Sequence, residues 1–591
     1  MSRPNELTYT LDATQPAEHR VHVELRLQPA LVSQDRDAGI ELYLPVWTPG
    51  SYMVREYSRH IESFTAVGAR TGAALDWSKT SKNTYRVRAP DEGEAIIRYT
   101  VYGHELTVRT ADFTAEHVFF DGACLFLWPR GAETQRASLH LRVPPDWRIA
   151  TQLPTVDGDP SHRVAQGLAD IVDAPVLAGR FQEVPFEVLG TPHRFVLDGL
   201  DGVSVPETLV PDTVAVIEEA AAIFGGELPY DDYQFLALFA HEGRGGLEHT
   251  RSSTLLAPRT ALHDRRSYDD YLGLVAHEHF HVWNVKRMRP AELWDYDFER
   301  ENYTRLLWVA EGMTAYYDDL LCCRAGVLPP ERYLQILSDQ IQAVRNTPGR
   351  LVHPLSMASF DAWIKLYRPD ENSRNSTQSY YTHGAMAALC LDLTIRSETD
   401  GAASLDDVMA ELYRTTFGEQ RGYTRDDLLS CLTRAAGRPL DDLVAALVDG
   451  PFDPDFGSLL PPFGVALVDR NEGGPYLGVH FNPRKLVVAS VLRDGPAAAA
   501  HLSPGDEILA VEGLRVRRSN WSDIIRSVWR EEATMELLVS RRGRIIKVAV
   551  QPRPAPHATA RLTLQTDASA DQVRQRDAWL QPRRARGAQD T

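Results

Sequence analysis

The sequence predicts a multidomain α+β protein, because the residue pattern changes three times along its 591 residues. Apolar and polar residues alternate through much of residues 1–185, as in β-strands with one buried face. From about residue 268 to 450 the apolar residues recur at helical spacing. A stretch rich in Pro, Asp and Gly then precedes a second β-rich pattern at 463–552. One hydrophobic core rarely extends over a chain this long, so we expect several domains.

The first two expected domains differ in their strand and helix content. Residues 1–185 form a β-sandwich or a saddle-like sheet, with the clearest alternation at 20–27. Residues 186–455 begin with a helix at 211–224, which ends at two glycines, and continue with a strand at 234–240. From about residue 268 this second domain is mainly helical.

The composition excludes several classes of function. A net charge of −18 argues against general binding to nucleic acids, which needs a basic face, and is compatible with an acidic cleft for positively charged substrate ends. No stretch of about 18 apolar residues could span a membrane, and the first residues lack the apolar run of a signal peptide. The five cysteines have neither a disulfide nor a Cys-x-x-Cys spacing. We therefore expect a cytoplasmic protein.

The chemistry of the chain is centred on the pattern His277-Glu278-x-x-His281. In a helix, His277 and His281 lie one turn apart on one face, where two neutral imidazoles can bind one Zn²⁺. Glu278 is rotated too far to be a ligand, but it can take a proton from a metal-bound water. His279 faces away, and we expect it to have no role in the chemistry. The alternative is a buried helix with two structural histidines.

A catalytic zinc needs a third protein ligand and one open position. Glu311 lies in a strongly apolar helical run, 307–317, where an unpaired carboxylate would be costly to bury. Coordination to Zn²⁺ removes that cost, although an ordinary ion pair is the alternative. We therefore expect one Zn²⁺ per chain, bound by His277, His281 and Glu311.

These residues resemble the zinc site of the gluzincins, and of the metalloaminopeptidases among them, although thirty positions separate His281 from Glu311, more than in the better-known members. We expect the extra residues, 289–302, to form a loop. The run Gly245-Gly246-Leu247-Glu248-His249 resembles the Gly-x-Met-Glu-Asn stretch of those aminopeptidases. The resemblance implies that Glu248 binds the free α-amine of the substrate, beside Gly245 and Gly246. The alternative is a turn carboxylate.

A second resemblance to the same enzymes concerns the segment from Ser379 to Met386. It is similar to their Tyr-x-Lys-Gly segment, whose tyrosine donates a hydrogen bond to the developing oxyanion. Tyr381 is at the matching distance from Gly384, and His383 stands where that pattern has Lys. Tyr380 stays an alternative donor, and a packed aromatic side chain at the start of a helix is the other alternative.

Two further stretches, 45–58 and 283–290, resemble the glycyl aminopeptidase family. These are gluzincin zinc metallopeptidases with a C-terminal PDZ domain. The resemblance implies a thermolysin-like catalytic domain within 186–455 and a PDZ domain at 463–552. It also implies an aminopeptidase that prefers small N-terminal residues such as Gly and Ala.

The C-terminal region fits the PDZ expectation. The loop Leu477-Gly478-Val479 resembles a PDZ carboxylate-binding loop, which binds the C-terminus of a peptide at a sheet edge. The alternative is a PDZ fold kept only as a structural cap. Residues 553–591 are expected to be a mostly flexible tail, with a short helix near 568–580.

The sequence thus predicts a zinc aminopeptidase that acts on peptides with a free N-terminus. Glu278 is the expected base and Tyr381 the expected oxyanion donor. Two alternatives stay open. One is a metalloendopeptidase guided by the PDZ domain, and the other is a catalytically silent PDZ adaptor on a peptidase scaffold.

Overall fold

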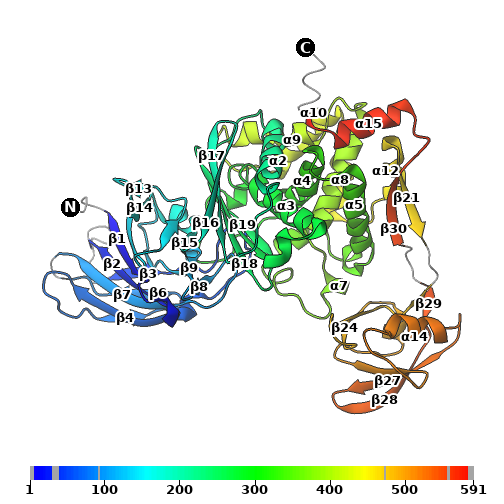
Figure 1. The fold of residues 1–591 in the computed structure, drawn as a ribbon, viewed down its shortest axis with the longest axis horizontal. Coiled ribbons are helices and arrows are strands. Elements are labelled where there is room, and N and C mark those ends of the chain that lie inside the picture. The colour runs from blue at the N-terminus through cyan, green and yellow to red at the C-terminus, as the bar shows by residue number, and fades with distance from the viewer. Residues whose placement is uncertain (1–5, 29–38, 91–92, 471–473, 555–558, 584–591) are drawn as a thin grey trace. The chain divides into compact units, whose positions relative to one another are not determined.

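The computed structural model describes residues 6–28, 39–90, 93–470, 474–554 and 559–583 (Figure 1). The described chain divides into two compact units. The first unit contains the chain up to Tyr303 together with Tyr413–Gly422, and the second contains Thr304–Leu412 and the chain after Gly422. None of the described helices combines the length and the apolar character needed to cross a membrane.

A seven-stranded sheet forms one part of the N-terminal domain. Its strand β2 (Arg20–Leu27) buries every second residue, as the sequence predicts. β1 pairs with β2 in an antiparallel and with β11 in a parallel direction. The strand order is β13 (Thr155–Val156), β14 (Asp159–Ala165), β11 (Ala137–Arg142), β1 (Leu7–Asp12), β2, β7 (Ala95–Tyr102) and β4 (Ile61–Gly68).

Two four-stranded sheets share one hydrophobic core with this sheet. Their orders are β10 (Trp128–Pro129), β3 (Ile40–Tyr43), β6 (Thr84–Val87), β5 (Trp77–Lys79), and β12 (Arg148–Ala150), β15 (Val176–Gly179), β9 (His117–Phe120), β8 (Ala111–Phe113). Short helices join the strands: η1 (Pro16–Glu18), η3 (Tyr57–His60), η4 (Gly122–Cys124) and α1 (Leu168–Val172). The expected N-terminal β-rich domain is confirmed.

A five-stranded mixed sheet follows, in the order β16 (Gln182–Val188), β17 (Thr191–Asp198), β18 (Tyr233–Ala240), β20 (Ser252–Pro258) and β19 (Gly245–Glu248). β17, β18 and β20 are parallel, and α2 (Leu209–Ile223) makes the crossover from β17 to β18. β19 is the edge strand and runs antiparallel to β20. After η5 (Arg259–Leu262), α3 (Arg265–Phe280) packs against β19, β20 and α2.

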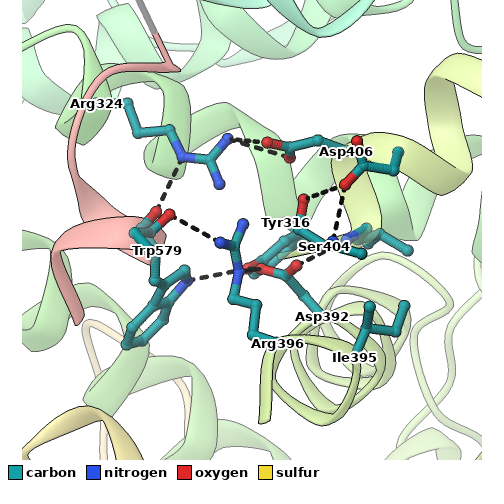
Figure 2. A network of polar contacts seen from close by, with 12 residues as sticks. Tyr316, Arg324, Asp392, Ile395, Arg396, Ser404, Asp406 and Trp579 are labelled. Atoms are coloured by element: carbon teal, nitrogen blue, oxygen red, sulfur yellow. Dashed lines mark hydrogen bonds and ion pairs between the residues drawn. The ribbon is translucent and has the colours of Figure 1, made fainter. Parts of the chain in front are cut away.

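Residues 304–463 are mainly helical, which confirms the helical middle part. Its elements are η7 (Trp308–Met313), α4 (Thr314–Arg324), α5 (Pro330–Arg345), η8 (Pro348–Leu351), α6 (Leu355–Phe360), α7 (Ser373–Ser376), α8 (Thr382–Glu398), α9 (Leu405–Thr416), α10 (Arg425–Ala436), α11 (Asp441–Val444), η9 (Ala445–Asp449), α12 (Phe456–Leu459) and η10 (Pro461–Phe463). Buried charges join three of these helices (Figure 2). Arg324 of α4 pairs with Asp406 of α9 at 3.0 Å, and Arg396 pairs with Asp392 within α8 at 2.9 Å.

The expectation of a mostly flexible tail is wrong for residues 559–564, which form a strand. β30 (Thr559–Leu564) pairs with β21 (Val465–Arg470), beside which it lies in Figure 1. α15 (Ala570–Leu580), the expected short helix, is also present. Trp579 of α15 is fully buried, and its carbonyl oxygen accepts a hydrogen bond from Arg324 Nε at 3.0 Å (Figure 2). The tail is ordered because the helices offer this aromatic side chain a buried site.

A small β-rich body with its own hydrophobic core occupies residues 475–554. It contains β22 (Pro475–Tyr476), β23 (Val479–Phe481), β24 (Val488–Val491), α13 (Pro496–Ala499), β25 (Glu507–Val511), β26 (Leu514–Arg515), α14 (Trp521–Val528), β27 (Met535–Arg541), β28 (Arg544–Val550) and β29 (Arg553–Pro554). The expected strands are present, whereas the assignment as a PDZ domain stays a prediction.

Candidate active site

α3 carries both predicted histidine ligands at its C-terminal end. The Asp264 side chain accepts a hydrogen bond from Ser267 N at 3.1 Å and so caps the first turn. The ring centroids of His277 and His281 are 4.7 Å apart. His281 Nδ1 lies 2.7 Å from the Asn284 carbonyl oxygen, which can only accept, so Nδ1 carries the proton. Nε2 of the neutral ring then keeps the lone pair that a metal needs.

Glu278 is buried against the edge strand β19, with 5% of its surface exposed. A Cβ on Gly246 would lie 2.0 Å from Glu278 Oε1, so only glycine leaves room for this carboxylate. Arg109 fixes the strand by donating from Nη2 to the Gly246 carbonyl oxygen at 3.0 Å. Gly245 is less crowded, since the nearest atom to its added Cβ would be 3.6 Å away. Gly246 therefore shapes the surroundings of the predicted base.

Glu248 ends β19 close to the same groups. Ligand atoms of Glu248, Glu278 and His281 all lie within 4.8 Å of one another. Glu248 is 3% exposed, and its Oε1 has no hydrogen-bond partner among the described residues. A buried carboxylate oxygen without a partner is costly, and a cation or an ammonium group would satisfy it.

The N-terminal domain contacts Glu248 through a turn at Gly50. The φ angle of Gly50 is +86°, and a Cβ there would lie 2.4 and 2.5 Å from the two carboxylate oxygens of Glu248. Both the backbone conformation and the lack of space therefore require glycine. The stretch 45–58, which resembles the glycyl aminopeptidases, thus contributes directly to the surroundings of Glu248.

The loop expected at 289–302 contains only the short helix η6 (Ala291–Leu293) and packs against the N-terminal domain. Trp47 donates from its indole nitrogen to the Asp297 carbonyl oxygen at 2.8 Å. Val46 N donates to the Phe298 carbonyl oxygen at 2.9 Å. These contacts hold the long connection in place after His281.

His279 is fully buried and lies outside this arrangement of groups. Its Nε2 is 2.6 Å from the Tyr230 hydroxyl, which also lies 3.0 Å from His193 Nε2. Burial lowers the pKa of His279 well below its usual value, so the ring is neutral. Its contacts are those of a packed structural histidine.

Within the second unit, the π-helix η7 carries Glu311, which is 2% exposed. π-Helical turns are frequent at functional sites. A Cβ on Gly312 would lie 2.6 Å from the Gly384 Cα, so the backbones of η7 and α8 are in direct contact. This close packing fixes Glu311 relative to the start of α8.

Tyr381 directly precedes α8 and is half-buried, whereas Tyr380 is fully buried. The Tyr381 hydroxyl lies 3.1 Å from the Tyr367 hydroxyl. Burial and then the negative charge of Glu311 raise the pKa of Tyr381 well above its usual value. The second unit therefore brings Tyr381 and Glu311 into electrostatic contact, with the phenol protonated.

Backbone hydrogen bonds within the small β-rich body hold its expected peptide-binding loop in place. The Leu477 and Gly478 carbonyl oxygens each accept a backbone hydrogen bond at 2.8 Å, from Ala497 and Leu492. The φ angle of Gly478 is +71°, and Val479 begins β23. The binding role of these three residues stays a prediction.

Sequence reasoning missed two charged residues of the N-terminal domain, Arg109 and Asp173. Asp173 pairs with Lys286 at 2.5 Å and accepts a hydrogen bond from Thr250 N at 2.8 Å. Neither Arg109 nor Asp173 belongs to a motif. Only Lys286 had a signal in the sequence, because it lies in the stretch 283–290.

Two stretches of the chain match known family models. Residues 270–387 match the M61 glycyl aminopeptidase, and residues 8–180 match the peptidase M61 N-terminal domain. Both stretches belong to the M61 glycyl aminopeptidase family. The first M61 stretch contains most of α3, all of η7, and Tyr380 and Tyr381. The second contains Gly50, Arg109 and Asp173.

One solved structure is similar to nearly the whole chain. A crystal structure of an aminopeptidase N family protein from Idiomarina loihiensis is 28% identical, covers 98% of this chain and 100% of its own, and has a TM-score of 0.90. An M1 zinc metallopeptidase from Deinococcus radiodurans is 16% identical and covers 76% of this chain and 95% of its own, with a TM-score of 0.47. No curated protein matches the sequence. The first similarity extends the resemblance well beyond the M61 stretches.

Proposed function

We propose that this chain is a zinc-dependent aminopeptidase that hydrolyses the N-terminal peptide bond of peptides and prefers small first residues such as Gly and Ala. The observation that carries the proposal is the buried Glu248 carboxylate. It lies close to Glu278 and His281, and its Oε1 lacks a hydrogen-bond partner among the described residues. Such a carboxylate suits the ammonium group of a free N-terminus.

His277, His281 and Glu311 would hold one Zn²⁺ in a gluzincin-type site, because two imidazoles and one carboxylate leave one position open. The lone pair on His281 Nε2 and the burial of Glu311 support this ligand set. When bound, the metal would polarise the scissile carbonyl and make a water molecule more acidic.

The residues of the chain would then divide the proton transfers between them. Glu278 would take a proton from the attacking water and deliver it to the leaving amine. Tyr381 would donate a hydrogen bond to the substrate carbonyl oxygen as that oxygen gains negative charge. Its raised pKa keeps the phenol protonated, and its partial exposure favours it over the fully buried Tyr380.

The preference for small first residues is supported by the M61 glycyl aminopeptidase match and by the turn at Gly50. Even a Cβ at position 50 would collide with Glu248, so the backbone of the N-terminal domain lies directly against the proposed amine-binding group. We expect this backbone to leave little room for a bulky first side chain. Glycyl and alanyl substrates should therefore be cleaved faster than leucyl substrates.

A metalloendopeptidase guided by a PDZ domain is the second candidate. It is favoured by the separate core of residues 475–554 and by the glycine turn at Leu477, Gly478 and Val479. In that case a peptide C-terminus would bind at this loop, and N-terminally acetylated peptides would be cleaved as fast as free ones.

Metal analysis combined with hydrolysis of glycyl and alanyl p-nitroanilide, with and without a chelator, tests the proposed function. We expect one zinc per chain and loss of activity when the chelator is added. The control is Glu278→Gln, which keeps both histidines and should keep zinc while losing activity. A protein without zinc, or hydrolysis that the chelator leaves unchanged, would refute the proposal.

A further inference from the structure

Asp173 joins three segments that lie far apart in the sequence. It follows α1 of the N-terminal domain, and its Oδ2 accepts hydrogen bonds from Thr250 N at 2.8 Å and from Gln152 Nε2 at 3.1 Å. Its Oδ1 lies 2.5 Å from Lys286 Nζ and 3.6 Å from His249 Nδ1. His249 and Thr250 directly follow Glu248, so Asp173 holds the end of the strand that carries the proposed amine-binding carboxylate.

Lys286 connects the same aspartate to the end of α3. Its backbone N–H donates to the His281 carbonyl oxygen at 3.0 Å, and its side chain is 4% exposed. Its Nζ lies 2.5 Å from Asp173 Oδ1, and this carboxylate is the counter-ion of the ammonium group. The ammonium group is therefore charged, and it interacts electrostatically with Glu248.

The negative charge of Glu248 is available to a substrate only if Lys286 pairs with another carboxylate. Among the described residues, Lys286 forms an ion pair with Asp173 and none with Glu248. Glu248 still has a buried oxygen without a hydrogen-bond partner. A lysine released from Asp173 would find in Glu248 a buried anion that needs a cation, because an unpaired buried charge is costly. Lys286 would then compete with the ammonium group of the substrate.

We propose that Asp173 is a positioning residue for substrate recognition: it binds Lys286 so that the negative charge of Glu248 stays available for the free N-terminus of the peptide. The same carboxylate fixes the backbone just after Glu248. This inference rests on the proposed aminopeptidase function. It goes beyond that function by assigning a positioning role to Asp173 of the N-terminal domain and to its partner Lys286, in the stretch 283–290.

The test uses the full-length zinc-loaded protein and three variants: Asp173→Asn, Lys286→Met and the double variant. Asparagine keeps one oxygen acceptor, for Thr250 N, but replaces the oxygen that faces Lys286 by an NH₂ group, so the lysine loses both the charge and the acceptor that hold it. Calorimetry measures the binding of L-alaninamide, with N-acetyl-L-alaninamide as the blocked control, in forms that also carry Glu278→Gln so that the amide is not hydrolysed. Alanyl p-nitroanilide gives KM and kcat for the forms that keep Glu278. Zinc content and thermal unfolding are measured for each variant, so that a folding defect is recognised.

For Asp173→Asn, we expect the Kd for L-alaninamide and the KM to rise about tenfold or more, with kcat nearly unchanged. The double variant should regain nearly wild-type affinity, because it lacks the competing cation. A double variant that binds L-alaninamide as weakly as Asp173→Asn would overturn the inference. So would a loss in kcat at constant KM.

Two further results keep the test decisive. Lys286→Met alone should bind L-alaninamide nearly as well as the wild type, and a tenfold loss would show that the lysine itself aids recognition. If Asp173→Asn does not fold, the double variant takes its place, because replacing both members of a buried pair is often tolerated. A loss of affinity for L-alaninamide of tenfold or more in the double variant would overturn the inference. A wild-type protein that binds both amides equally well would refute the proposed function itself, whereas normal discrimination with unchanged variants would refute only the role of Asp173.

Discussion

At the scale of single residues, two neighbouring carboxylates are proposed to have different tasks because their surroundings differ. Glu278 follows a histidine on α3 and is pressed against Gly246 of β19. Glu248 lies at the end of β19, and the Asp173–Lys286 pair contacts the residues that follow it. Both carboxylates are buried, so each needs a partner that offsets the cost of burying its charge.

Replacing Tyr381 by Phe tests the proposed oxyanion donor. The change removes only the hydroxyl, so kcat for alanyl p-nitroanilide should fall by about 10²-fold or more while KM changes little. The matched control is Tyr380→Phe, at a fully buried neighbour, which should keep kcat within a few-fold. If Tyr380→Phe is the inactive variant, the roles of the two tyrosines are exchanged.

The sequence predicts the residues of α3 well and their partners poorly. His277, Glu278 and His281 stand at fixed helical spacing, so a local pattern contains their relation. Gly50, Asp173 and Glu248 come from three strands and loops that only the tertiary fold brings together. No periodicity in the chain records such contacts, and the sequence therefore gave no reason to consider Asp173.

At the scale of elements, the edge strand β19 determines how close Glu278 and Glu248 come to each other. Because a Cβ at Gly246 would lie 2.0 Å from Glu278 Oε1, Gly246→Ala must displace either the carboxylate or the strand. We expect kcat/KM for alanyl p-nitroanilide to fall by about tenfold or more, since small misplacements of catalytic groups are costly.

The neighbouring glycine provides the control for this prediction. Gly245→Ala introduces the same methyl group where the nearest atom is 3.6 Å away, at ordinary contact distance. This variant should keep kcat/KM within a few-fold of the wild type. Equal losses in both variants would mean that the strand backbone, and not the space around Glu278, explains the effect.

The C-terminal helix α15 is predicted by the sequence as a short helix, but the composition does not reveal that it is anchored by a buried side chain. Its surroundings are rich in Pro, Ala, Gln and Arg, which is typical of a mobile tail. Two features outweigh that composition: the capping box of Ser569 and Gln572, and the burial of Trp579. α15 packs against the buried charge pairs of α4, α8 and α9, which lie far away in the sequence (Figure 2).

Replacing Trp579 by Ala should therefore destabilise the protein. The change leaves a cavity and removes the indole N–H that donates to the Tyr316 hydroxyl at 3.1 Å. We expect the free energy of unfolding to fall by about 3–5 kcal/mol, measured by urea unfolding of the full chain. The control is Arg574→Ala on the exposed side of α15, which should leave the midpoint unchanged. Equal midpoints for wild type and Trp579→Ala would contradict the proposed anchoring.

At the scale of the whole molecule, the N-terminal domain takes part in the proposed site. It supplies Gly50 against Glu248, Arg109 against Gly246, and Asp173 against the turn between β19 and β20. The sequence predicts that a β-rich domain exists in this part of the chain. Its contribution to the site depends on how the domain packs onto the five-stranded sheet, which no single stretch of sequence encodes.

His117 gives this packing a pH dependence. It lies 3.0 Å from Asp112 and 2.6 Å from Asp198 of β17, so it links β9 to the five-stranded sheet. Burial acts to lower the pKa of His117, but the two carboxylates raise it to about 9. The folded protein thus keeps a proton that the unfolded chain releases near the ordinary pKa of 6.5.

Because the folded pKa is raised, the stabilisation from His117 is fully present below about pH 6.5 and is lost as the pH rises towards about 9. The loss should amount to roughly 2–3 kcal/mol in the free energy of unfolding, measured by urea unfolding at pH 6, 7.5 and 9. His117→Asn should remove this component of the pH dependence. Identical pH profiles for the variant and the wild type would contradict the assignment.

The central claim is that Glu248 recognises the free N-terminus of the substrate, and one comparison tests it most directly. The measurement is kcat/KM for alanyl p-nitroanilide and for its N-acetylated form, with wild type and Glu248→Gln at equal zinc content. We predict that the wild type strongly prefers the free amine and that the variant loses about 10²-fold on the free form only. Equal rates on both substrates for the wild type, or equal losses on both for the variant, would contradict the claim.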